Sequence, residues 1–186
     1  MKMLIEIRWH GRGGQGVVSV SRLLADAALI DGKYAQAFPE FGPERLGAPI
    51  LGFTRISDEP IDVHSQIYRP HYVVVLDPTL LKTINVFEGL IENGSAVINT
   101  DKSPEEIKQE FSIEKFNVYT INATKIALEI LGRPIYNTAM LGALVKASNL
   151  VSLESVREVT LKRFKGEVGE KNVAVINKAY EELEAS

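Results

Sequence analysis

The sequence predicts an α/β protein, a three-layer α/β/α single domain over residues 1–186 with a mixed, mostly parallel sheet. Three observations predict this class. A first strand at 3–9 runs through a glycine-rich turn straight into an amphipathic helix, as at the start of a βαβ unit. An unbroken apolar stretch at 72–76 has the pattern of a central strand that is buried on both faces. Short strands and helices then alternate through the second half of the chain.

The first half of the chain is expected to hold the antiparallel part of the sheet. In order we expect a helix that ends at Asp31-Gly32, a strand at 33–38, a loop at 39–49 and a strand at 50–56. The prolines and glycines of 39–49 exclude regular structure within it. Residues 61–65 are expected to return beside 50–56 as an antiparallel hairpin, so that the antiparallel region covers about 47–65.

The second half is expected to be mostly helical. In order we expect a helical segment at 79–92, a strand at 95–99, a helix that starts at Ser103, a strand at 116–121, a helix from Asn122 to Leu131, and helices at 136–147, 153–164 and 170–184. Ser103 and Glu106 have the spacing of a capping box, and Asn122 is a good N-cap. Nearly every face of 136–147 is apolar or small, which predicts a helix buried on two sides, with Gly142 allowing close approach.

Composition excludes several kinds of function. The chain of 186 residues is 45% hydrophobic and 24% charged with a net charge of -3, so neither nucleic acid nor a membrane surface is an expected partner. Cysteine is absent, which removes disulfides, thiolate metal sites and cysteine-ligated iron–sulfur clusters. No apolar run approaches the ~20 residues of a transmembrane helix, and no signal peptide is evident, so we expect a soluble cytoplasmic protein.

The turn after the first strand is the strongest binding motif. Its six residues are Gly11, Arg12, Gly13, Gly14, Gln15 and Gly16. They satisfy G-x-G-x-x-G between a strand and a helix, a context in which bare backbone amides and the helix dipole favour a phosphate or other anion. Arg12 could add a charge-assisted bond. The alternative is a turn that only lets helix and strand pack closely; a P-loop is excluded because Val17 stands where lysine is required.

The rest of a dinucleotide fingerprint is doubtful. An acid for the ribose hydroxyls is expected about 20 residues after the loop, at the end of the second strand. Asp31 has the spacing but precedes that strand, and Glu40 follows the strand but lies in the proline loop. Asp77 ends the central strand, where it could contact a ligand or simply form a turn with Pro78.

No catalytic set or metal site is evident. His10, His64 and His71 are scattered and are interpreted as ordinary strand and loop residues. There is no H-E-x-x-H motif and no G-x-S-x-G elbow. The sequence therefore has binding features without residues that would carry out a reaction.

Two long motifs, HGRGGQGVVSVSRLLADAA and PEFGPERLGAPILGFTRIS, carry a family resemblance. Together with DPTLL and NATKIALEILGRPIYNTAMLGAL, they resemble the gamma subunit, or gamma domain, of the 2-oxoacid:ferredoxin oxidoreductases, most of all the pyruvate (pyruvate synthase) type. The resemblance implies a share in the CoA-dependent oxidative decarboxylation of pyruvate to acetyl-CoA, CO2 and reduced ferredoxin, or in its reverse.

The resemblance also implies partners and cofactors. Alpha, beta and delta subunits would be partners, with thiamine diphosphate and iron–sulfur clusters on those chains only, and ferredoxin would be met indirectly. The gamma subunit is associated with coenzyme A and could form a homodimer when isolated. Candidate coenzyme A contacts are Gly11, Arg12, Gly13, Gly14, Gln15, Gly16, Glu44, Arg45 and Asn137, none of them catalytic. Asn137 could instead cap its helix.

Two alternatives remain open at this point. One is a self-sufficient NAD(P)-dependent dehydrogenase that uses the glycine loop for its cofactor. The other is a pure assembly subunit that binds no small molecule.

Overall fold

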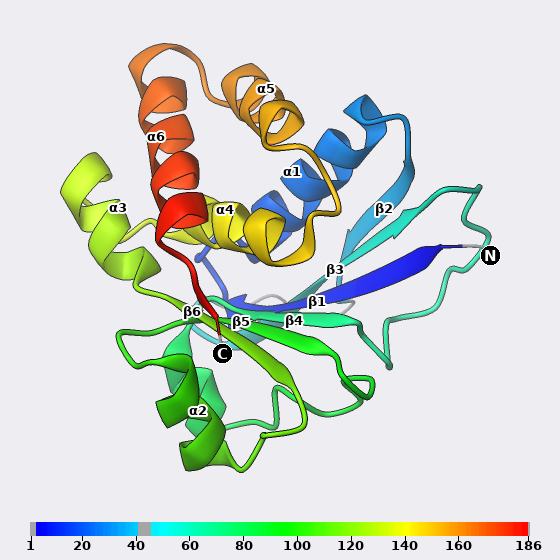
Figure 1. Ribbon diagram of the computed structural model, residues 1–186. Coiled ribbons are helices and arrows are strands. Elements are labelled where there is room, and N and C mark those ends of the chain that lie inside the picture. The colour runs from blue at the N-terminus through cyan, green and yellow to red at the C-terminus, as the bar shows by residue number, and fades with distance from the viewer. Residues whose placement is uncertain (1–2, 41–45, 186) are drawn as a thin grey trace.

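The computed structural model describes residues 3–40 and 46–185, and its centre is a seven-stranded mixed sheet of order β2-β3-β1-β4-β5-β6-β7 (Figure 1). The strands are β1 (Leu4–Arg12), β2 (Tyr34–Pro39), β3 (Pro49–Ser57), β4 (Tyr72–Val75), β5 (Ser95–Asn99), β6 (Asn117–Ile121) and β7 (Glu184–Ala185). The helices are α1 (Val17–Ile30), the 3-10 helix η1 (Pro78–Lys82), α2 (Pro104–Phe111), α3 (Ala123–Leu131), α4 (Asn137–Ser148), α5 (Leu153–Arg163) and α6 (Gly166–Glu182).

Helices cover both faces of the sheet, which confirms the predicted three-layer architecture. One hydrophobic core joins the sheet to α1, α3, α4, α5 and α6, and a second core joins the opposite face to η1 and α2 (Figure 1). Strand alternation divides the side chains: Val74 of β4 enters the first core, while Val73 and Val75 enter the second. Strands β1, β4, β5 and β6 are parallel, whereas β3 and β7 run antiparallel to their neighbours.

The direction in which the chain leaves the parallel strands changes twice along the sheet. After β1 and β6 it enters α1 and α3 on the first face, and after β4 and β5 it enters η1 and α2 on the second (Figure 1). Neighbouring connections therefore diverge between β1 and β4, and again between β5 and β6. Such switch points open crevices at the carboxyl ends of the strands, where α/β proteins bind ligands.

The predicted helix signals are confirmed. Ser103 and Glu106 form the capping box of α2, and the Asn122 side chain accepts a hydrogen bond from the Lys125 amide at the start of α3. Residues Asn137 to Val145 of α4 are all buried. A Cβ on Gly142 would lie 2.3 Å from the Ile176 carbonyl oxygen, so glycine is what lets α4 and α6 touch.

The prediction of a strand at 61–65 is wrong. Strand β3 is antiparallel as expected, but it pairs with β1 on one side and β2 on the other, so neither edge is left for a further strand. Fully buried Arg55 holds the 61–65 region instead, donating to the carbonyl oxygens of Val63 and Ser65 at 3.4 and 2.7 Å. Carbonyls that the prediction assigned to a strand ladder thus bond to a side chain.

The prediction of a helix over 79–92 is also wrong beyond its first turn. The chain forms η1 and then successive turns. Arg8 of β1 donates to the carbonyl oxygens of Val86 and Glu88 at 3.0 and 2.6 Å. Gly89 has a φ of 71°, and its backbone packs so closely on the Tyr68 carbonyl that a Cβ would not fit. These long-range contacts take carbonyls that a helix would use, in a stretch rich in β-branched residues.

Three element ends differ from the prediction. Strand β1 continues through Gly11 and Arg12, because both pair with β3. The prolines that bound the predicted loop at 39–49 belong to the ends of β2 and β3, where a missing amide is tolerated. The last helix begins at Gly166 rather than at 170, and β7 follows it at the sheet edge.

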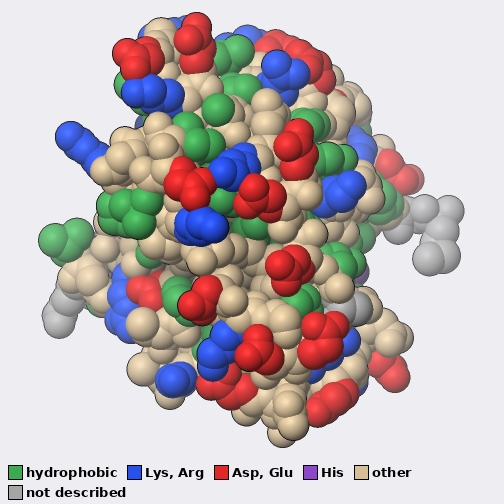
Figure 2. Space-filling model, turned by 60° about the vertical axis from the view of Figure 1, so that its left-hand side comes forward, with side chains coloured by type: hydrophobic (Ala, Val, Ile, Leu, Met, Phe, Trp, Pro, Cys, Tyr) green, Lys and Arg blue, Asp and Glu red, His purple; other side chains and the backbone are tan. Residues whose placement is uncertain are grey.

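Charges of both signs are interspersed over the face that Figure 2 presents. On the helices, oppositely charged residues four positions apart form ion pairs, such as Glu158–Lys162 and Glu167–Lys171. Pairs of this kind add a few tenths of a kcal/mol to a helix. No helix in residues 3–40 and 46–185 has the length and apolar character to cross a membrane.

Candidate functional site

The glycine loop lies at the switch point between β1 and β4. Gly11 is still part of β1, and a Cβ there would lie 2.4 Å from Val17 Cγ2, so its lack of a side chain serves helix–strand packing. The Gly13 amide donates to the Ala48 carbonyl at 2.9 Å, and its carbonyl accepts from the Gly47 amide at 3.1 Å. Residues 47–48, which precede β3, therefore hold the loop through two backbone hydrogen bonds.

Gly14 and Gly16 shape the loop through backbone conformation. Their φ angles are 91° and 78°, which side-chain-bearing residues rarely adopt. Gly16 is the N-cap of α1; within residues 3–40 and 46–185 no side chain caps this helix, and its first turn holds no acidic residue. A helix start of this kind has backbone amides without a side-chain partner and the positive end of the helix dipole, the two features that bind anions in other proteins.

Asn137 from α4 is brought against the same helix start. Its Nδ2 donates to the Gly16 carbonyl oxygen at 3.5 Å, and a Cβ on Gly16 would lie 2.4 Å from that nitrogen. Tyr136 occupies the N-cap position of α4 and no side-chain bond caps that helix, so the alternative of Asn137 as the cap is not what the structure shows. The sequence separation of 121 residues hides this contact from local patterns.

Asp77 is the hub of the loop's side-chain bonds. Its Oδ2 accepts from Arg12 Nε at 3.1 Å and from Gln15 Nε2 at 2.8 Å, while Oδ1 accepts from the Thr79 amide and hydroxyl. Arg12 also donates to Thr79 Oγ1 and to the Gly47 carbonyl, and Gln15 Oε1 accepts from the Arg12 amide. Arg12, Gln15 and Asp77 thus form one network that braces the loop.

This network sets the charge of the site. Partial burial alone would raise the pKa of Asp77, but bonds from Thr79 and Gln15 and the charge of Arg12 together bring it below its ordinary value. Burial, aided by the charge of Asp77, raises the pKa of nearby Tyr136. Asp77 is therefore ionised at neutral pH and offsets the charge of the Arg12 guanidinium, so the positive end of the α1 dipole is a source of positive potential at this loop that Asp77 does not pair with.

The structure brings together most of the predicted site, but not all of it. Glu44 and Arg45 lie outside the described residues. Asp31 lies at the far end of α1, where its carboxylate accepts from the Ser152 amide and from two serine hydroxyls at the start of α5. Thr79 and Tyr136 were not predicted, and for Thr79 the Asp-Pro-Thr sequence after a buried strand was the available signal.

The sheet order bears directly on dinucleotide binding. In the Rossmann arrangement, the strand whose end carries the ribose acid lies beside the first strand. Here the antiparallel β3 is inserted between β1 and β2, so Glu40 after β2 is displaced by one strand from that position. Neither Asp31 nor Glu40 thus has the geometry of a ribose-binding acid.

The histidines have structural surroundings. Buried His10 accepts from Arg8 Nε at 3.0 Å, and burial followed by the charge of Arg8 lowers its pKa to about 3. His71 Nδ1 accepts from the Glu6 amide, and His64 is exposed. Within the described part of the chain, no group of three or more His, Asp or Glu side chains is placed to hold a metal ion.

Known proteins of similar sequence match nearly the whole length of the chain. A sequence model for the pyruvate ferredoxin/flavodoxin oxidoreductase family matches residues 6–182. The chain is 51% identical over 181 residues to the "Pyruvate/ketoisovalerate oxidoreductases common subunit gamma" of Pyrococcus furiosus, covering 97% of this chain and 98% of that protein. It is also 51% identical over 180 residues to "Pyruvate synthase subunit PorC" of Methanocaldococcus jannaschii, covering 97% of each.

A solved structure supports the same assignment. The crystal structure of pyruvate oxidoreductase subunit PORC from Thermotoga maritima has a TM-score of 0.88 and 43% sequence identity, covering 98% of each chain. Similarity in sequence and in fold thus extends over nearly the whole molecule. The chain therefore belongs to the pyruvate ferredoxin/flavodoxin oxidoreductase family, and it is similar to the gamma and PorC subunits of that family.

Proposed function

We propose that this chain is the gamma subunit of a pyruvate-type 2-oxoacid:ferredoxin oxidoreductase. The complex would convert pyruvate and coenzyme A to acetyl-CoA and CO2 with reduction of ferredoxin, or catalyse the reverse. The supporting observation is identity of about half the residues over nearly the full length of subunits so named. The Pyrococcus relative is named as common to pyruvate and ketoisovalerate enzymes, which supports a role that tolerates more than one 2-oxoacid.

We propose a division of labour in which partner subunits supply the reactive chemistry. The chain has no cysteine to ligate an iron–sulfur cluster, and the glycine-loop crevice is lined by backbone and by residues that bond to one another. Alpha, beta and delta subunits would carry thiamine diphosphate and the clusters, and residues 1–186 would form one gamma-type domain. We expect the isolated chain to have no turnover.

We propose that the glycine loop contributes contacts to coenzyme A. That substrate carries a pyrophosphate and a 3′-phosphate, and the uncapped start of α1 offers amides and a positive dipole to such groups. Arg12 and Gln15 would hold the loop in shape through Asp77. Glu44 and Arg45, from the second family motif, would contact the ligand or a partner chain.

The test uses the assembled complex. Gly14→Ala places a methyl group at a positive φ inside the loop, whereas Gly32→Ala imposes the same kind of backbone strain at the other end of α1, where no atom lies within 4 Å of the new methyl group. We expect Gly14→Ala to raise KM for coenzyme A roughly tenfold, a loss of about 1.4 kcal/mol, with KM for pyruvate unchanged. Gly32→Ala should leave both constants unchanged.

Two outcomes would replace this proposal. Normal kinetics in an assembled Gly14→Ala complex would remove the loop from coenzyme A binding and leave assembly as the role of the chain. Titration of the isolated chain with NADH and with coenzyme A separates the dehydrogenase alternative. Tight NADH binding without coenzyme A binding would favour that alternative.

A further inference from the structure

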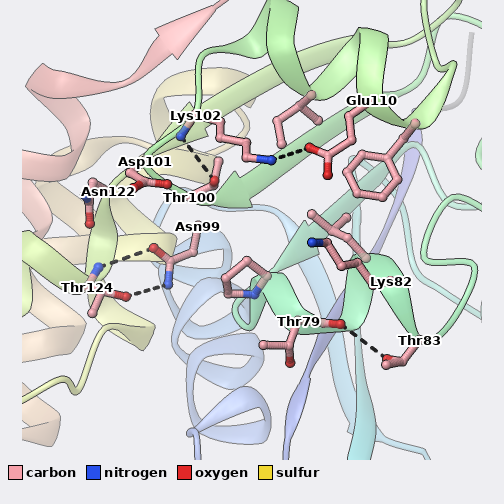
Figure 3. A pocket seen from close by; sticks show the side chains of 14 residues that line it. Thr79, Lys82, Thr83, Asn99, Thr100, Asp101, Lys102, Glu110, Asn122 and Thr124 are labelled. Atoms are coloured by element: carbon pink, nitrogen blue, oxygen red, sulfur yellow. Dashed lines mark hydrogen bonds and ion pairs between the residues drawn. The ribbon is translucent and has the colours of Figure 1, made fainter.

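The second switch point, between β5 and β6, opens a cavity that the glycine loop does not line. It is a cavity of about 620 Å³ bounded by η1, the residues after β5, α2 and the start of α3 (Figure 3). This volume is within the ~300–1,000 Å³ range of small-molecule sites. Its position at the carboxyl ends of diverging parallel strands is where ligands bind in α/β sheets.

One wall of the cavity is apolar. It is formed by Pro78 and Leu81 of η1 and by Ile107 and Phe111 of α2. Ile107 and Leu81 are 1% and 9% exposed, so they belong to the rigid second core rather than to a mobile surface. Such a wall suits the face of a planar ring.

The rim of the cavity carries charge. Lys102 is ion-paired with Glu110, and Lys82 is close enough to contribute to the lowered pKa of Glu110, after the hydrogen bond and charge of Lys102 (Figure 3). The exposed side chain of Lys82 forms no hydrogen bond or ion pair with any residue in 3–40 or 46–185. Lys102 interacts with Glu110, Glu106 and Asp101, whereas the Lys82 ammonium group lies on the same rim and is available to a further anion.

Polar side chains complete the lining. They are Thr79, Thr83, Asn99, Thr100, Asp101, Asn122 and Thr124. Asn99 is committed to the fold, since its Nδ2 donates to the Leu76 carbonyl and to Thr124 Oγ1 and its Oδ1 accepts from the Thr124 amide. Asp101 is exposed on the rim and can accept hydrogen bonds from hydroxyl groups.

The helix starts around this cavity are already capped. Asp77 accepts from the first turn of η1, Ser103 from that of α2 and Asn122 from that of α3. Backbone amides are therefore not the binding groups here, in contrast to the glycine loop. Recognition of a ligand would depend on the lysines, Asp101 and the apolar wall.

We propose that this crevice binds a nucleoside monophosphate or a molecule of the same chemistry, in which a planar ring and a hydroxylated linker carry one phosphate. The ring packs on Leu81, Ile107 and Phe111, the hydroxyls donate to Asp101, and the phosphate replaces Glu110 between the two lysines. The cavity shares Thr79 with the glycine-loop network, but the contacts proposed here come from Leu81, Asp101, the two lysines and α2, and the proposal does not depend on the function proposed for that loop. The same chemistry is also present in the nucleotide end of coenzyme A, and the experiment must separate the two sources.

The first test is isothermal calorimetry of the full chain with AMP, adenosine and inorganic phosphate. AMP is expected to bind at least tenfold more tightly than either of the other two, because only AMP uses both the wall and the lysines. No measurable AMP binding at millimolar concentration would overturn the proposal. Equal affinity for phosphate and AMP would overturn it as well, since the ring would then contribute nothing.

Variants locate the site. Lys82→Gln is expected to lower the affinity for AMP about tenfold, and Asp101→Asn is expected to lower it several-fold. Glu110→Gln should raise the affinity, because it releases Lys102 from its ion pair. Lys171→Gln is the matched control, an exposed lysine on α6 at the opposite face of the sheet, and it should have no effect. All four side chains are on the surface, so the variants should fold. Unchanged AMP affinity in both Lys82→Gln and Asp101→Asn would overturn the proposal.

A last arm separates the two nucleotide sources. If free nucleotide is the ligand, Gly14→Ala leaves AMP affinity unchanged and coenzyme A does not compete with AMP. If coenzyme A competes with AMP and Lys82→Gln weakens both, the crevice is the nucleotide end of the coenzyme A site, and a separate site is ruled out. If Gly14→Ala does not change KM for coenzyme A in the assembled complex, the coenzyme A proposal for the glycine loop is wrong, but the interpretation of the AMP measurements is unaffected.

Discussion

The two crevices at the carboxyl edge of the sheet arise in the same way but offer opposite chemistry. Both lie where neighbouring connections leave toward different faces, at β1/β4 and at β5/β6. At the first, no side chain of the described part of the chain caps α1. At the second, η1, α2 and α3 each begin with a side-chain cap. Topology thus decides where a crevice forms, and capping decides whether backbone amides remain to bind a ligand.

The two crevices also differ in whether a charged side chain is available to a ligand. At the glycine loop the guanidinium of Arg12 is neutralised by Asp77, so the backbone is the remaining source of positive potential. At the second crevice the backbone is committed and Lys82 supplies an available charge. Four substitutions test this contrast, and the expected loss of stability decreases from the first to the last.

The largest effect is expected from Gly16→Ala, which should lower the free energy of unfolding by about 3 kcal/mol. The residue has a φ of 78°, and the new methyl group would meet Asn137 at 2.4 Å. Gly32→Ala, with a φ of 75° and open space, should cost only about 1 kcal/mol. Urea unfolding measures both. Equal losses would mean that the Asn137 contact does not constrain the start of α1.

Asn99→Ala removes the side chain that bonds to the backbone at the second crevice, and it should lower the free energy of unfolding by about 2 kcal/mol. It leaves the Leu76 carbonyl and the Thr124 amide without their partner inside the fold. Asn117→Ala is the control, because Asn117 is exposed and its side chain donates one bond, to the Asn93 carbonyl. Chemical denaturation of the two variants gives the comparison. A loss for Asn99→Ala no greater than that of the control would contradict the role assigned to Asn99.

Asp77→Asn tests the neutralised charge and should cost about 1.5 kcal/mol at neutral pH. Because the folded pKa of Asp77 is lowered from 3.8, its contribution is full above that value and is lost as the pH falls through the lowered folded pKa. The difference between wild type and variant should therefore shrink in acid. A difference that is the same at neutral and at strongly acidic pH would show that the ionised carboxylate contributes nothing.

Ser103→Ala removes the capping box of α2 and should cost about 1 kcal/mol. Glu105→Gln, in the same first turn but outside the capping box, should cost only a few tenths. Thermal unfolding followed by circular dichroism distinguishes them. If Ser103→Ala leaves the stability unchanged, α2 does not need its side-chain cap. The difference in capping between the two crevices would then contribute nothing to the stability of the fold.

The candidate site was only partly predictable. The glycine loop was found because glycine, strand and helix signals lie within one short stretch. The sequence allows Arg12 to bond to a ligand phosphate, but it does not reveal that Arg12 bonds to Asp77, Thr79 and Gly47, which follows from the β1/β4 pairing that places the two strand ends side by side. The second crevice is lined by segments that are far apart in the sequence, namely η1, α2 and the residues after β5 and β6. Parts of the DPTLL and NATK motifs are among them, but neither motif by itself indicates a cavity.

Residues close together along the chain were enough to predict the α/β class, most of the helices and strands, the caps of α2 and α3, and the family. The folded structure was needed to show that β3 lies between β1 and β2 and that Asn137 meets Gly16. It was also needed to show which carbonyls the buried arginines bond: those of Val86 and Glu88 for Arg8, and those of Val63, Ser65 and Gln66 for Arg55. These outcomes depend on which distant surfaces meet and on which buried polar groups must find partners, and local periodicity records neither.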